Sequence, residues 1–154
     1  LERCALQERV FALDARIVVP DLLYERELRN YNGEELRRLG LGVEGLTGDE
    51  LQVAQALRIE APAITVPDSL ALALARERRW ILLAGDGAMR TLAVKHAVDC
   101  HGVLWLLDQM ELSAVATIHQ LDTGLRQLAE HPRCRLPRSE ITVRLTRYKE
   151  TLGR

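Results

Sequence analysis

The sequence predicts an α/β domain built around a short parallel sheet. Short aliphatic runs alternate with helix-like segments along most of the chain, and the clearest run, residues 81–84, leads through Gly85, Asp86 and Gly87 into a helix. Parallel strands are apolar on both faces, and a helix between two of them is the usual crossover. The 154 residues suit one domain, so we expect a single body.

The expected strands are brief and end at turn residues. Residues 17–19 are β-branched and stop before Pro20, because the residue preceding a proline is held in an extended conformation. The other runs that we interpret as strands are 43–44, 81–84 and 98–100.

The expected helices fill most of the remaining chain. Thr47 and Glu50 form the pattern of a capping box, which predicts a helix from there to about residue 59. Residues 65–79 are so rich in Ala and Leu that this helix must be buried, and Pro67 lies in its first turn. Further helices are expected over 4–13, from 21 to about 30, and over 34–39, 87–96, 103–112, 114–129 and 138–152, the last being a C-terminal amphipathic helix.

Composition excludes two classes of protein and leaves charge as the informative property. With 47% hydrophobic and 28% charged residues the chain is not disordered, and its longest apolar stretch, residues 70–75, is too short to cross a bilayer. The net charge is −1, yet residues 126–154 carry 8 Lys and Arg against 3 Asp and Glu. A basic end suits a polyanionic partner, although a solvated helix explains it equally well.

The cysteines indicate a reducing compartment. Cys4, Cys100 and Cys134 are odd in number and contain no close pair of the kind found in zinc or redox motifs. With no signal peptide evident, we expect a cytoplasmic protein.

Three carboxylates occupy places that ask for an explanation. Tyr24, Leu28 and Tyr31 predict a stripe of side chains on the buried face of one helix. Glu27 follows Tyr24 by three residues on that stripe, so it lies on the buried face unless it reaches water from the stripe's edge. Asp68 lies in the first turn of a helix, where the helix dipole favours it, and Asp86 is placed to cap the next helix.

Taken together, the three carboxylates predict a metal site. Each lies near the start of a helix that follows an extended or turn segment, where side chains of a parallel sheet converge. Gathered carboxylates repel one another unless a divalent cation lies among them, and oxygen ligands suit Mg²⁺ or Mn²⁺. Such an ion activates water and stabilises charge on a phosphodiester, so phosphodiester hydrolysis is the chemistry that we expect.

The same segments carry a family resemblance. Residues 19–28, 67–75 and 82–90, which contain Glu27, Asp68 and Asp86, occur in the order and surroundings of a PIN domain. Residues 101–108 and 135–137 are similar to the later parts of that family. The chain therefore resembles the PIN-domain family over most of its length.

The resemblance implies a three-layer α/β/α sandwich and a metal-dependent endoribonuclease. Glu27, Asp68 and Asp86 match the family's acidic residues, which bind Mg²⁺ or Mn²⁺ and cut RNA, and Arg90 lies where it can pair with a carboxylate or a phosphate. Small members of the VapC-like subgroup are ribonuclease toxins of type II toxin–antitoxin pairs, so a cognate antitoxin is an expected partner. The late helices would suit a homodimer.

One departure from the family pattern leaves two possibilities open. Family members open with a strand that ends in an aspartate, whereas this sequence begins at Leu1 within a helix-like segment, and Asp14 lies at the wrong end of a different strand. We expect that the N-terminal strand is missing from the sequence. The alternative is a degenerate PIN-like module that binds a partner without catalysis.

Overall fold

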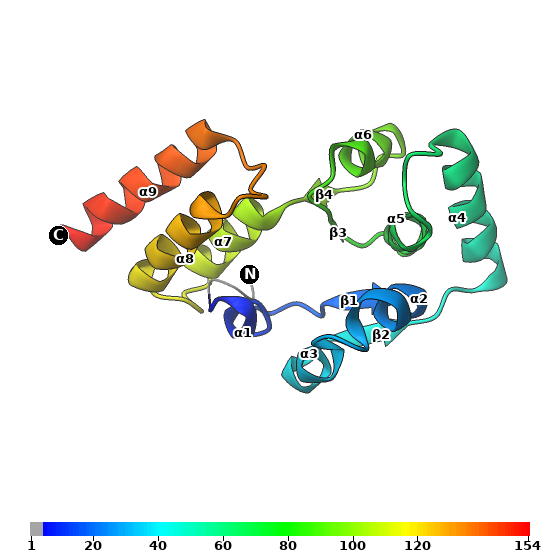
Figure 1. Ribbon diagram of the computed structural model, residues 1–154, viewed down its shortest axis with the longest axis horizontal. Helices are drawn as coiled ribbons and strands as arrows, with labels where there is room; N and C mark the ends of the chain where they lie inside the picture. Colours follow the sequence, from blue (N-terminus) through cyan, green and yellow to red (C-terminus); the bar gives the residue numbers. More distant parts are fainter. Residues whose placement is uncertain (1–4) are drawn as a thin grey trace. The chain divides into compact units, whose positions relative to one another are not determined.

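The computed structural model describes residues 5–154, and the chain divides into two compact units (Figure 1). One unit comprises residues 16–102; the other combines the described residues up to Ala15 with residues 103–154. Cys4 and the start of the first predicted helix lie outside the described residues. The single body that we expected therefore stays a prediction.

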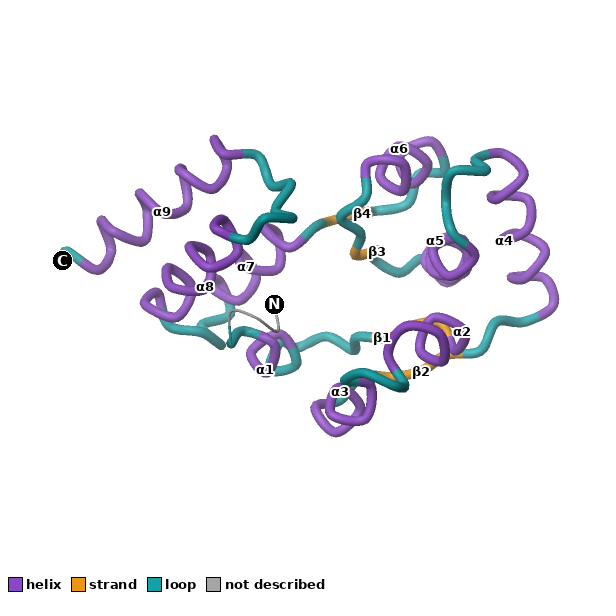
Figure 2. Tube along the Cα trace, in the orientation of Figure 1, coloured by secondary structure: helices purple, strands orange, loops and turns teal. Residues whose placement is uncertain are grey.

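The unit of residues 16–102 carries all the strands of the described chain, with helices between them. Its elements are β1 (Val18–Pro20), α2 (Asp21–Leu23), the π-helix η2 (Tyr24–Leu28), α3 (Gly33–Leu39), β2 (Gly42–Glu44), α4 (Gly48–Glu60), α5 (Val66–Arg78), β3 (Leu82–Leu83), α6 (Gly87–Lys95) and β4 (Cys100–His101). Figure 2 shows how little of the chain the strands occupy. Every predicted strand is present, shifted by one or two residues.

The strands form two parallel pairs that share one helix. β1 pairs with β2 through the register Val18 to Gly42, and β3 pairs with β4 through Leu82 to Cys100. Helix α5 contacts both β1 and β3. Short parallel strands connected by helices confirm the predicted α/β class.

Within the described residues, each strand of these two pairs is hydrogen-bonded to another strand along one edge only. In β3 the Leu82 amide donates to Asp99 at 2.8 Å and the Ala84 amide donates to His101 at 3.0 Å. Alternate residues of a strand point their backbone groups to opposite edges, so the N–H and C=O of Leu83 face away from β4. Leu83 also keeps 39% of its surface exposed, whereas a strand inside a parallel sheet is covered on both faces.

Helix α5 is the centre of this unit's core. The Thr65 hydroxyl accepts a hydrogen bond from the Asp68 amide at 3.2 Å, which caps the helix, and Arg79 ends it in the left-handed conformation. Leu72 and Ala73 have no exposed surface, and they pack with residues of α4, β3 and α6. The prediction of a buried Ala/Leu helix is confirmed.

A capping box and an arginine hold α4 against α5. Thr47 and Glu50 exchange both predicted bonds, at 3.2 and 2.8 Å. The Arg78 guanidinium donates Nε to Glu50 Oε1 at 2.8 Å and Nη2 to Glu50 Oε2 at 3.0 Å, and it also reaches Glu44 at 3.1 Å. Arg78 is the main reason that the pKa of Glu50 falls from 4.5 to about 2.

The second unit is helical in its described part. It contains α1 (Gln7–Val10), α7 (Val103–Leu112), α8 (Ile118–Glu130) and α9 (Arg138–Leu152). The helix predicted from residue 114 begins four residues later, because Ala114 takes a left-handed conformation and Thr117 forms a capping box with Gln120. The bounds predicted for α7 and α9 are confirmed. In the described part of the chain no helix is long and apolar enough to cross a bilayer.

Ion pairs connect α7 to α9 around a buried tyrosine. Arg144 donates Nε and Nη2 to the two oxygens of Asp108 at 2.8 and 2.5 Å, and Arg147 pairs with Asp108 and Glu111. Tyr148 has no exposed surface, and its hydroxyl has no hydrogen-bond partner among the described residues. Burial raises the pKa of this phenol to about 12.

Candidate acidic site after the parallel strands

Glu27 lies in the π-helix η2. This helix continues from α2, the short helix that follows β1. The Arg29 amide donates to the Tyr24 carbonyl at 2.8 Å, five residues back, so the turn is wider than an α-helical turn. A side chain at Gly33 would collide with the Leu28 carbonyl and the Tyr24 ring, which lie 2.7 and 2.8 Å from a Cβ built there. Glycine thus lets the chain turn close beneath the wide helix.

The predicted burial of Glu27 is wrong, because the wide turn changes which residues share a face. Tyr24 is buried, but Tyr31, predicted on the same stripe, is 71% exposed, and Glu27 is exposed as well. The stripe assumed 3.6 residues per turn throughout. Glu27 therefore presents its carboxylate to solvent, the alternative that the sequence left open.

Asp86 follows β3 and caps α6. Its Oδ1 accepts hydrogen bonds from the Ala88 amide at 2.6 Å and the Met89 amide at 3.4 Å. The capping role predicted for it is confirmed. The residue is exposed, and Oδ2 has no hydrogen bond within the described residues, so one oxygen remains for a ligand.

Asp68 lies in the first turn of α5, the helix that contacts both β1 and β3. It is half-buried, and its carboxylate has no hydrogen bond or ion pair in the part of the chain that the structure describes. The N-terminal dipole of α5 stabilises the negative charge there. The carboxylate is therefore available to a ligand.

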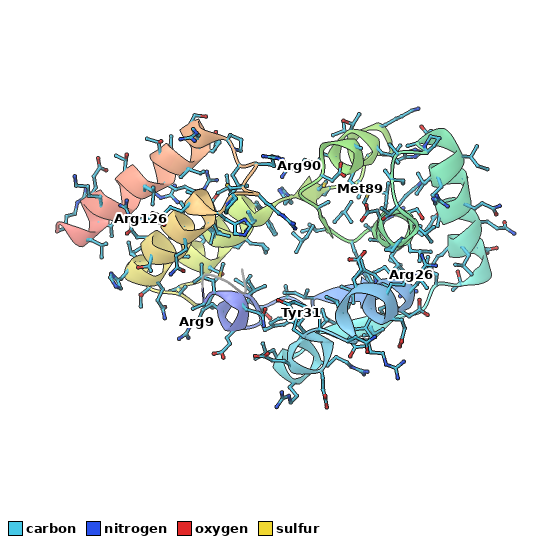
Figure 3. All side chains as sticks on the ribbon, in the orientation of Figure 1. Arg9, Arg26, Tyr31, Met89, Arg90 and Arg126 are labelled. Atoms are coloured by element: carbon cyan, nitrogen blue, oxygen red, sulfur yellow. The ribbon has the colours of Figure 1, made fainter. Side chains whose placement is uncertain are left out.

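Arg90 lies at the carboxyl ends of β3 and β4. Its Nε donates to the Ala84 carbonyl at 3.2 Å, and its guanidinium covers Gly102 so closely that a Cβ at that position would displace it. Figure 3 labels Arg90 beside Met89 on α6; Met89 belongs to the core, whereas Arg90 is exposed. Among the described residues Arg90 forms no ion pair with a carboxylate.

The positive charge of Arg90 also influences the thiol of a neighbouring residue, Cys100. Burial raises the pKa of Cys100 on β4, and the positive charge of Arg90 opposes that rise.

A PIN-domain family model matches residues 1–150. The chain belongs to the PIN-domain family. Comparisons with curated proteins and with solved structures found no match. Membership confirms the predicted family and PIN-like fold and indicates a nuclease-type function.

The PIN domain does not gather its three predicted carboxylates into an ion site. Within residues 5–154 no group of three or more His, Cys, Asp or Glu side chains lies close enough together to hold a metal ion. Glu27 lies within η2, Asp68 lies in the first turn of α5 and Asp86 precedes α6, where one of its oxygens caps that helix. The described side chains therefore do not make a complete ligand set for Mg²⁺ or Mn²⁺.

Two features of the PIN domain were not predicted from the sequence. The π-helix has no simple sequence signal, although Gly33 after the Tyr24 segment is consistent with a tight approach. Gly102 leaves room for the guanidinium of Arg90, and its place two residues after the predicted strand 98–100 was the available signal.

Proposed function

We propose that this PIN domain is an endoribonuclease that hydrolyses RNA phosphodiesters. The observation that supports the proposal most is the guanidinium of Arg90 at the ends of β3 and β4, one helical turn after Asp86 and without a carboxylate partner among the described residues. An arginine in that position suits a phosphate, because its planar N–H groups match phosphate oxygens.

The proposed chemistry assigns roles to four side chains. Hydrolysis adds water at phosphorus and breaks a P–O bond, and negative charge grows on the phosphate oxygens as this happens. Arg90 has N–H groups beyond the one bound to Ala84 with which to stabilise that charge. Asp68, Asp86 and Glu27 are the proposed catalytic carboxylates, and the requirement for Mg²⁺ or Mn²⁺ is part of the proposal.

The biological setting is also proposed. A ribonuclease toxin of a type II pair, with a cognate antitoxin and a cytoplasmic location, agrees with the small PIN domain and its basic C-terminal segment. A homodimer through the late helices is a further part of this proposal.

Cleavage of an oligoribonucleotide tests the proposal. The assay compares Mg²⁺, Mn²⁺ and EDTA for the wild-type chain and for Asp86→Asn, Asp68→Asn and Glu27→Gln. Asparagine caps helices as well as aspartate does, so Asp86→Asn removes charge while keeping the cap of α6. We expect each variant to lose about 100-fold or more of the cleavage rate.

A first-turn aspartate of another helix provides the matched control. Asp49 of α4 is exposed, and Asp49→Asn should cleave at the wild-type rate. Unchanged cleavage by both Asp68→Asn and Asp86→Asn would reject the catalytic roles.

A non-catalytic binding module is the second candidate. The separated carboxylates favour it, because no metal-holding group forms among the described side chains. RNA binding that depends on Arg90, together with no cleavage under any metal condition, would identify this alternative.

A further inference from the structure

An open hollow of about 520 Å³ lies where α8, α9 and the segment that joins them meet. Its wall includes the apolar side chains of Ala129, Leu136 and Ile141 and the basic residues Arg135 and Arg138. The volume lies within the range of small-molecule sites and exceeds what a lone phosphate needs. All of its lining belongs to one compact unit.

Positive charge in this hollow is available to a ligand. Residues 131–138 contain three arginines and no acidic residue, and among the described residues Arg135 and Arg138 form no ion pair. By contrast, Arg126 of α8 pairs with Asp122 at 2.9 Å, and Arg144 of α9 pairs with Asp108 at 2.5 Å. Glu130 also lines the hollow, so two unpaired cations face one carboxylate.

Local bonds give the segment a defined shape. The Cys134 amide donates to the His131 carbonyl at 2.9 Å, and the Arg133 amide donates to His131 Nδ1 at 3.1 Å. Pro137 precedes the first residue of α9, and the helix has no side-chain cap within the described chain. The dipole of this 15-residue helix therefore adds positive potential beside Arg138.

We infer that the hollow between α8 and α9 binds the phosphate backbone of single-stranded RNA through Arg135 and Arg138. The inference rests on the proposed ribonuclease function and assigns it a substrate site outside the unit that carries Glu27, Asp68 and Asp86. A nucleotide fits both properties of the hollow, because its phosphate matches the guanidinium groups and its base can lie against Leu136 and Ile141. A polyanion without apolar groups, such as polyglutamate, would use the charge but not the apolar wall.

Binding measured without cleavage tests the site. The probe is a fluorescein-labelled single-stranded oligoribonucleotide in EDTA, followed by anisotropy between about 50 and 200 mM KCl. The variant Arg135→Gln/Arg138→Gln should bind about tenfold more weakly at the lowest salt. Its slope of log K against log salt should be shallower by about 1.4, since each phosphate contact to a single strand contributes about 0.7.

Arg126→Gln is the matched control. It removes an exposed arginine of α8 that already pairs with Asp122, so its affinity and slope should match the wild type. Circular dichroism melting of each variant checks that the fold is kept.

Several outcomes overturn the inference. These are no RNA binding by the wild-type chain, an unchanged slope in the double variant, or an equal loss in Arg126→Gln. Polyglutamate that competes as well as RNA of equal charge would assign the hollow to an acidic protein instead. A failure of cleavage alone refutes the nuclease proposal and leaves this binding result standing.

Discussion

Replacing Glu50 by glutamine removes a charge from the junction of α4 and α5 while keeping the local geometry. Glutamine can still accept the Thr47 amide, because Gln serves in capping boxes as Glu does. The change therefore isolates the bidentate pairing with Arg78. A pKa of about 2 in place of 4.5 corresponds to about 3 kcal/mol of stability at neutral pH.

Partial exposure of the two side chains to solvent makes the stabilising free energy smaller than this. The side chains of Arg78 and Glu50 keep 25% and 10% of their surface exposed, and Arg78 retains Glu44 after the substitution. We therefore expect Glu50→Gln to lower the free energy of unfolding by about 1–2 kcal/mol at pH 7.

The contribution of Glu50 to the free energy of unfolding depends on pH. Because the pKa of Glu50 is lower in the folded chain, its stabilising effect is complete above about pH 4.5 and disappears as the pH falls toward 2. Urea unfolding followed at 222 nm should show a gap between wild type and Glu50→Gln that is constant from pH 6 to 8 and falls below about half by pH 3.

An exposed neighbour is the control for this experiment. Glu77 precedes Arg78 on α5 and is exposed, so Glu77→Gln should unfold at the wild-type urea concentration. Equal stability of Glu50→Gln and wild type at pH 7, or a gap that stays constant down to pH 3, would refute the reasoning.

Two further substitutions probe the other unit and the candidate site. Tyr148→Phe should raise the free energy of unfolding by about 1 kcal/mol, because it removes a buried hydroxyl without a partner among the described residues; a lower melting temperature would contradict this. Gly102→Ala should weaken oligoribonucleotide binding as much as Arg90→Gln does while leaving the melting temperature near that of wild type, since the added methyl displaces only the end of the Arg90 side chain. Wild-type binding by Gly102→Ala would show that the position of Arg90 is unimportant.

Helices whose first residues carry a capping pattern were predicted well. Thr47 with Glu50, and Thr65 with Pro67, fixed the starts of α4 and α5 within a residue, because capping is decided by neighbours in sequence. The start of α8 was predicted four residues early, although its capping box at Thr117 and Gln120 has the same form.

The arrangement of the acidic site could be predicted only in part from neighbouring residues. Asp86 was predicted as a cap and is one, since that role depends on the next three residues. Whether Glu27, Asp68 and Asp86 meet depends on the path of the chain between distant elements, and no spacing along the sequence encodes it. The π-helix that begins at Tyr24 also altered the helix face on which Glu27 lies, and no spacing along the sequence predicted that wide turn.

The π-helix also has a consequence for how this segment tolerates changes in length. A wide turn of this kind is equivalent to an α-helix that has accepted one extra residue. Deleting one residue between Tyr24 and Leu28 would restore the α-helical ladder without breaking the chain's course.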